Sequence, residues 1–116
     1  MPHVVLRGAA ELPRAWRELP RGPWRWGRAV ARVEGCYLAA EQRALLVAGV
    51  VVELGRPVHP VVLVTLRGLS TAVHLWPVVQ VERTEAVLRF LVQVAGELRS
   101  FGAAEVETTN LASLIS

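Results

Sequence analysis

The sequence predicts one α+β domain over residues 1–116: an antiparallel meander of four to five strands, a long amphipathic C-terminal helix and a short N-terminal helix. Their order is β-α-β-β-β-β-α-β. Three observations predict this class. The length of 116 residues is that of one domain. Short apolar runs recur at even spacing between turn residues, as in a meander. Residues 84–101 repeat apolar side chains at helical spacing.

The chain begins with two short elements. Residues 3–7 (HVVLR) form an apolar run that ends at Gly8, and we interpret them as a strand. A short helix follows at 13–19, because Pro13 suits the first turn of a helix. The segment 20–23 contains two prolines and a glycine, which indicates a rigid connection.

Residues 24–38 are interpreted as one long strand, because small apolar residues alternate with larger or charged ones. Gly35 is the expected site of a bend or bulge. The side expected to face the core carries Gly27, Ala29, Ala31 and Val33, and the opposite side carries Trp24, Trp26, Arg28 and Arg32.

Two further segments, 43–54 and 60–67, are apolar at nearly every position and are therefore apolar on both faces of the predicted strands. The turn at 68–70 leads into a strand at 71–76. Pro77 limits that strand to an edge of the sheet or ends its pairing there, because proline lacks a backbone N–H.

The amphipathic helix at 84–101 is the clearest element. Thr84 is placed to cap its first turn, and Gly102 stands where helices commonly end with a left-handed residue. Its apolar side chains form one continuous stripe. A final edge strand is expected at 104–109.

Composition narrows the class of protein. Apolar residues make up 53% of the chain and charged residues 20%, which excludes disorder for most of it. All 13 basic residues are arginine and all 10 acidic residues are glutamate. No apolar run approaches the roughly 18 residues of a membrane span, and no secretory signal is recognisable. We therefore expect a soluble, cytoplasmic protein without membrane contact.

The two-sided apolar strands at 44–54 and 61–66 lead to the main functional expectation. The helix at 84–101 can cover one face, but the short helix at 13–19 covers little of the other. An antiparallel face that meets water normally alternates polar with apolar residues. We therefore favour a homo-oligomer, most simply a symmetric dimer. The alternative is that residues 24–38 curl over the second face and close a small barrel or sandwich.

Arginine and tryptophan residues cluster in the N-terminal third. Residues 1–33 carry seven arginines and two glutamates, whereas residues 34–116 carry six arginines and eight glutamates. Arginine neutralises phosphate and indole stacks on bases, so this segment is a candidate contact for nucleic acid or for a partner protein. We favour a structural role, with packed indoles and ion-paired arginines. The candidate contact residues are Arg14, Arg17, Arg21, Trp24, Trp26, Arg28 and Arg32.

No motif with specific chemistry is present. His3, Cys36, His59 and His74 lie on different segments without the spacing of a metal site, so we predict no metal and no cofactor. A catalytic residue cannot be assigned. The leading hypothesis is a non-catalytic homo-oligomeric binding or accessory subunit. The alternatives are a nucleic-acid-binding module built on the Arg/Trp segment and a small enzyme with its site at a subunit interface.

Overall fold

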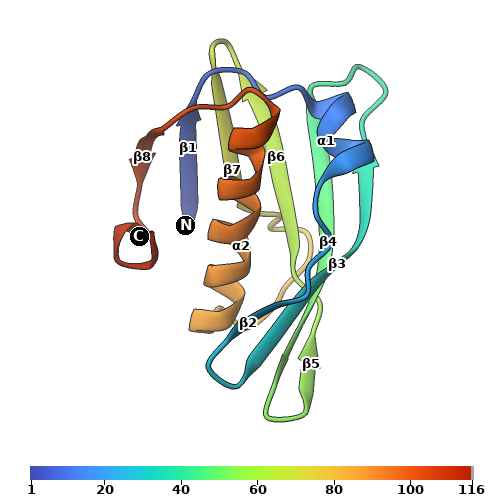
Figure 1. Cartoon of the computed structure of the whole chain (residues 1–116), viewed down its shortest axis with the longest axis vertical. Helices are drawn as coiled ribbons and strands as arrows, with labels where there is room; N and C mark the ends of the chain where they lie inside the picture. The colour runs from blue at the N-terminus through green and yellow to red at the C-terminus, as the bar shows by residue number, and fades with distance from the viewer. Residues whose placement is uncertain (116) are drawn as a thin grey trace.

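The computed structural model describes residues 1–115 and confirms an α+β fold with an antiparallel sheet and one long C-terminal helix (Figure 1). The predicted number of four to five strands is wrong, because the sheet has eight. The elements are β1 (His3–Arg7), α1 (Leu12–Glu18), β2 (Trp24–Trp26), β3 (Ala29–Leu38), β4 (Ala44–Glu53), β5 (Arg56–Val58), β6 (Val61–Arg67), β7 (Ser70–Leu75), α2 (Glu85–Glu97), the 3-10 helix η1 (Leu98–Phe101), β8 (Val106–Thr109) and the 3-10 helix η2 (Ala112–Leu114).

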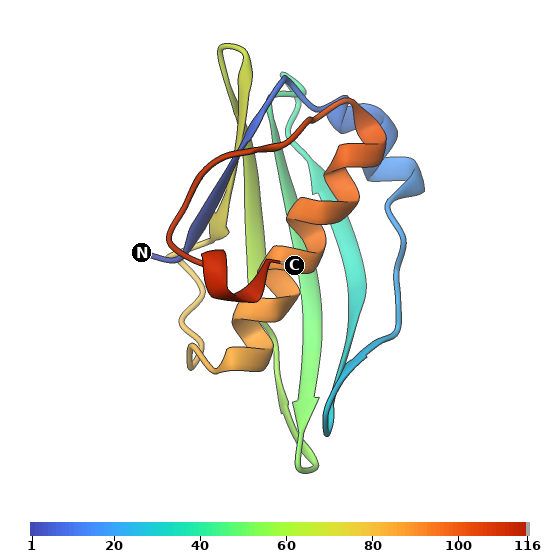
Figure 2. The same cartoon turned by 60° about the vertical axis from the view of Figure 1, so that its left-hand side comes forward.

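The sheet is a half-barrel that curves around α2. Its strand order is β2-β3-β4-β6-β7-β1-β8, with β5 paired to β4 beside this path. All pairs are antiparallel. The first strand in the sequence therefore lies between the last two. Figures 1 and 2 show α2 lying across the concave side of the sheet.

The predicted strand at 24–38 is instead a hairpin of β2 and β3. Trp26 pairs with Ala29 across a two-residue turn, in which Gly27 has a φ of 60°. Glycine at the first central position is a preferred choice for such a turn. Paired residues share a face, so Trp24 lies on the same side as its partner Ala31, which is fully buried. Both indoles therefore face α2, and not the opposite side as the alternation predicted.

Helix α2 fills the concave side. The Thr84 side chain accepts a hydrogen bond from the backbone N–H of Val87 at 3.2 Å, which confirms the predicted cap. The α-helix ends at Glu97, and the last predicted turn is the 3-10 helix η1. Phe90 is fully buried, and its ring occupies the space that a side chain at Gly49 of β4 would need. The centre of the core is thus formed by an aromatic ring against a bare strand backbone.

The short N-terminal helix lies on the same side of the sheet as α2. Helix α1 begins at Leu12, one residue before the predicted start, and buries Leu12 and Ala15. The connection from β1 is held by Thr71 of β7, which is fully buried. Its hydroxyl donates to the carbonyl of Gly8 at 2.8 Å and accepts from the N–H of Ala10 at 2.9 Å. Both helices thus pack on the concave face of the sheet, and neither helix covers the opposite, outer face.

A second unpredicted hairpin gives a test of backbone strain. Glu53 of β4 pairs with Arg56 of β5, so Leu54 and Gly55 form the turn, with φ angles of 51° and 77°. Leucine in this left-handed region is strained, whereas asparagine tolerates it. Leu54 is 76% exposed, so its replacement loses little burial. We expect Leu54→Asn to raise the free energy of unfolding by about 0.5–1 kcal/mol in chemical denaturation.

The matched control is Leu69→Asn. Leu69 is 85% exposed and also lies in a two-residue turn, but there the positive φ belongs to Gly68. The control should change stability by no more than about 0.5 kcal/mol. Equal denaturation midpoints for the two variants would show that Leu54 carries no backbone strain.

Candidate functional site

The outer face of the sheet, turned away from both helices, is the most unusual surface of the molecule. Along each strand the residues that alternate with the core positions point to this face. Cross-strand pairing joins them into rows: one row is Tyr37, Leu46, Leu63, His74 and His3, the next is Ala44, Thr65, Ala72 and Val5, and a third is Gly35, Ala48 and Val61.

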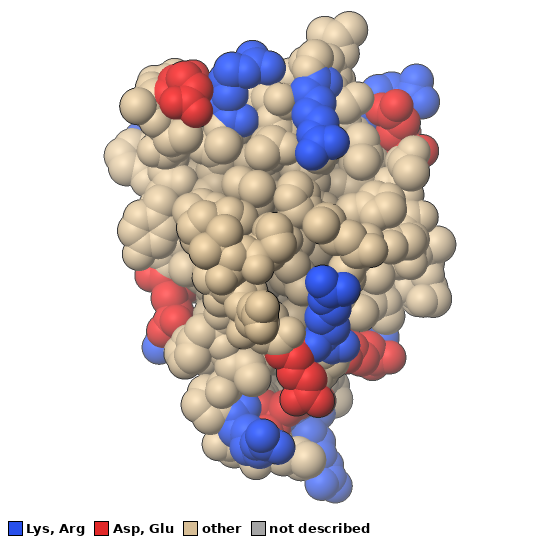
Figure 3. All heavy atoms as spheres, turned by 180° about the vertical axis from the view of Figure 1, so that it is seen from behind, with Lys and Arg blue, Asp and Glu red and all other residues tan. Residues whose placement is uncertain are grey.

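These three rows in the middle of the outer face contain no arginine and no glutamate. Leu46 and Leu63 are half-buried by their neighbours on the sheet, and Tyr37 is exposed. Burial, with smaller effects of Arg67 and His3, lowers the pKa of His74 below the ordinary value of histidine. Its imidazole is therefore neutral near pH 7. Figure 3 shows this face from behind: a tan area without charged side chains crosses its upper middle, and charged side chains lie above it and, from just below the centre, beneath it.

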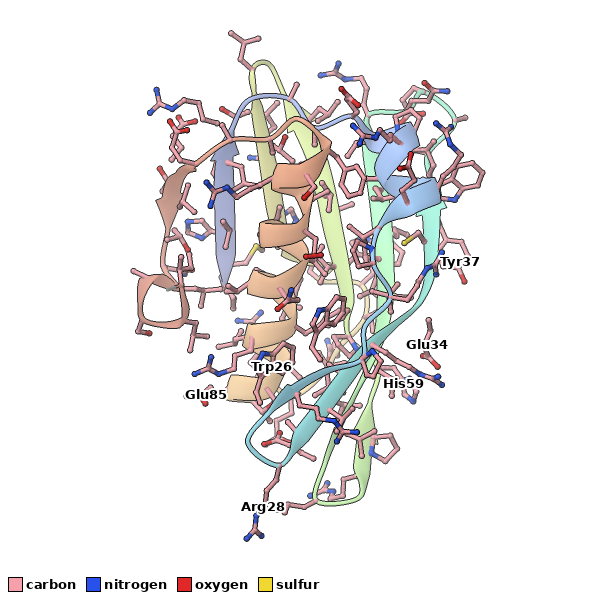
Figure 4. The ribbon with its side chains drawn as sticks, in the orientation of Figure 1. Trp26, Arg28, Glu34, Tyr37, His59 and Glu85 are labelled. Atoms are coloured by element: carbon pink, nitrogen blue, oxygen red, sulfur yellow. The ribbon has the colours of Figure 1, made fainter. Side chains whose placement is uncertain are left out.

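The candidate Arg and Trp residues are not brought together on one surface. Trp24 packs toward Phe90, with ring centroids 6.4 Å apart. Trp26 lies beside the start of α2, while Arg28 points away from the tip of the hairpin (Figure 4). Arg32 pairs with Val50 on the outer face. The indoles thus serve the concave side, and the arginines point elsewhere.

The remaining candidates lie on or next to α1. Arg14 contacts Glu11 and Glu18 at 3.4 Å and 3.5 Å, and its guanidinium stands 5.3 Å from the Phe101 ring centroid. Arg17 and Arg21 are exposed. The structure therefore spreads the seven candidate contact residues over α1, the β2–β3 hairpin and the outer face.

The histidines and the cysteine also lie apart. Cys36 is half-buried on the concave side, and burial raises the pKa of its thiol although Arg21 opposes this effect. The side chain of His59 contacts Glu34, with Nδ1 and Oε1 3.2 Å apart, in an exposed pair (Figure 4). Within residues 1–115, no group of three or more ligand side chains could hold a metal ion.

The Glu34–His59 pair was not predicted. A bulge between Val33 and Gly35 shifts the register of β3, and the short strand β5 leads the chain back to His59. The sequence signal for the bulge was Gly35, but nothing in residues 54–60 indicated the strand. Since both side chains are open to solvent, the pair has no pocket in which to hold a substrate.

Comparisons with protein-family models, curated proteins and solved structures found no match to this chain. No helix in the described part of the chain is both long and apolar enough to cross a membrane. The outer face is therefore the feature on which a function can be argued.

Proposed function

We propose that the protein is a cytoplasmic, non-catalytic binding or accessory subunit that works as a homodimer, with the outer faces of two sheets packed together. The observation that carries this proposal is that the three middle rows of the outer face contain no arginine and no glutamate and have Leu46 and Leu63 at their centre. In this proposal the partner that covers the outer face is a second copy of the chain.

The size of the outer face can be compared with that of known interfaces. Strands lie about 4.8 Å apart and rise about 3.3 Å per residue, so five strands of the curved sheet have a projected area of roughly 20 Å by 25 Å. The accessible area is larger, because side chains stand up from the sheet. Stable interfaces bury about 800 Å² per partner, whereas the largest apolar patch of a monomer is about 300–600 Å².

The character of the face favours another copy over a different partner. A two-fold axis brings identical patches together, which requires a surface that complements itself. The three rows place Leu46 and Leu63 at their centre, with tyrosine, threonine, histidine and small apolar residues around them and no arginine or glutamate. Such a surface can complement itself, and packed sheets commonly interdigitate their facing rows. A neutral His74 adds no charge to the contact. The hairpin of β2 and β3, the alternative cover, lies against α2 on the opposite side.

The mass in solution tests the proposal directly. Light scattering at a protein concentration of about 50 µM should give twice the 12.7 kDa of the chain. Dilution should shift the mass toward that of one chain, because association depends on concentration. A mass of 12.7 kDa that does not change with concentration would refute the dimer.

A charged substitution on the outer face makes the test specific. Leu63→Glu buries a carboxylate at the centre of the proposed contact, and the two-fold axis places it there twice. We expect the dissociation constant to rise at least about a hundredfold. The control is Leu69→Glu, at the exposed end of the same hairpin, which should remain a dimer. Circular dichroism checks that both variants fold, and equal dimerisation of the two would place the interface elsewhere.

A further inference from the structure

A groove of about 400 Å³ runs along α2 at the open side of the half-barrel. One wall is α2, and the other is formed by β1, β8 and η2. Trp26, from the opposite edge of the sheet, contributes to its lining. Figure 2 shows η2 lying in front of α2 on this side. The volume lies within the range of small-ligand pockets, about 300–1,000 Å³.

The groove is lined by aliphatic side chains on one side, while polar groups contribute the larger part of its exposed surface. The inner-face residues of β1 and the residues of β8 and η2 supply aliphatic side chains, and α2 adds one more from its wall. These side chains are Val4, Leu6, Val92, Val106, Leu114 and Ile115. Gly96 leaves part of the helix wall bare, because a Cβ at this position would meet no atom within 4 Å. The groove can thus accommodate a slender apolar group.

Cationic and amide side chains stand on the helix wall of the same groove. Arg89 and Gln93 lie one turn apart on α2, and Arg99 lies further along in η1. Arg89 contacts Glu85 at 3.4 Å, in a pair whose glutamate side chain is 73% exposed. Arg99 makes no ion pair with any residue among 1–115.

The carboxylates of the facing strand are engaged elsewhere. Glu105 contacts Arg7 at 3.1 Å, and Glu107 accepts a hydrogen bond from Ser70 at 2.9 Å. The groove therefore combines aliphatic side chains with one arginine, Arg99, that makes no ion pair within residues 1–115. Arginine binds carboxylates through a planar pair of N–H donors, which suits an anion held at one point.

From this combination we propose that the groove binds a small apolar molecule with one carboxylate, such as a medium-length acyl chain or an aryl acid. The apolar part lies against Val92, Val106 and Leu114, which are only half-buried, and the carboxylate is held by Arg99. This site goes beyond the proposed dimer and is independent of it, because the groove and the outer face lie on opposite sides of the sheet.

Calorimetric titration with decanoate tests the site, with decanol as the neutral analogue. We expect saturable binding of about one decanoate per chain, at least about tenfold tighter than decanol, because only decanoate carries the anion. No saturable binding of decanoate up to about 1 mM would overturn the proposal. Equal affinity for the two probes would overturn the role of Arg99.

Three variants locate the binding. Gly96→Leu extends a side chain into the groove from an exposed position and should abolish binding. Arg99→Gln should weaken decanoate about tenfold and leave decanol unchanged. The control Arg56→Gln removes one exposed positive charge from β5, outside the groove lining, and should leave decanoate affinity unchanged.

The outer face is the other surface that could attract an acyl chain, and Leu63→Glu separates the two. Decanoate should bind Leu63→Glu as well as the original protein, even where that variant no longer dimerises. Binding that survives in Gly96→Leu but is lost in Leu63→Glu would place the acid on the outer face and refute the groove. Dimerisation and decanoate binding can thus succeed or fail separately.

Discussion

Replacing Gly49 by alanine should lower the free energy of unfolding by about 2 kcal/mol, although alanine is normally the better strand residue. A methyl group at this position would overlap the ring of Phe90, which is fully buried between α2 and β4. The ring must move, and close-packed neighbours leave it little room. The change should appear as a lower midpoint in chemical denaturation and a melting temperature lower by about 5–10 °C.

Gly96→Ala is the matched control, because it adds the same methyl group to open space on α2. Alanine favours a helix interior by about 0.5–1 kcal/mol over glycine, so this variant should be more stable than the original protein. The double variant Gly49→Ala with Phe90→Leu should recover part of the loss from Gly49→Ala, because a smaller side chain faces the methyl. Additive effects of these two substitutions would show that the overlap is not the cause.

The second large effect is expected at Thr71, where valine preserves the shape and removes the hydroxyl. Two backbone groups then lose their partner, the partly buried carbonyl of Gly8 and the buried N–H of Ala10. Each unsatisfied buried group costs about 1–3 kcal/mol, so Thr71→Val should lower stability by about 2–4 kcal/mol. Hydrogen exchange should show the loss first in residues 8–12, which Thr71 ties to the sheet.

Thr65, on the neighbouring strand β6, is a threonine whose hydroxyl makes no hydrogen bond within the described part of the chain, in contrast to that of Thr71. Its hydroxyl is buried without a hydrogen-bond partner among the described residues. Thr65→Val therefore removes an unsatisfied group and should leave stability unchanged or raise it by about 1 kcal/mol. A similar loss from both threonines would mean that strand packing, and not the hydrogen bonds of Thr71, sets the cost.

The parts of the fold that could be predicted are those governed by local patterns. The amphipathic stripe and the Thr84 cap located α2, and Pro13 located α1 within one residue. The alternation of Ala29, Ala31 and Val33 correctly placed their side chains toward the core. These elements follow from hydrophobic periodicity and capping, which depend on residues only a few positions apart.

The hairpins were missed because a short turn changes which residues share a face. Read as one strand, residues 24–38 place Trp24 and Ala31 on opposite faces, but the turn at Gly27 brings them to the same one. The Trp-Gly-Arg-Ala order at 26–29 was a usable signal for that turn. No such signal marked β5, because leucine is an unusual residue at the positive φ of Leu54.

Of the two candidate surfaces, the outer face could be predicted from the sequence and the groove beside α2 could not. The apolar excess of 44–54 and 61–66 correctly indicated a second apolar face, and the structure places it opposite both helices. The groove beside α2 could not be predicted, because Arg89 and Arg99 lie on the polar side of the helix. In the sequence they resemble ordinary solvated residues. Only the approach of β8 and η2 gives them an apolar neighbour.

The position of β1 inside the sheet has a consequence for synthesis on the ribosome. Its backbone partners lie in β7 and β8, more than sixty residues later in the chain. Among the described strands β1 is translated first, and it must remain without these partners until residues 70–75 and 106–109 have been made. Such distant pairing slows folding and exposes apolar segments to aggregation in the meantime. Val4 and Leu6, which are fully buried in the folded protein, therefore stay exposed to nascent-chain chaperones throughout this interval.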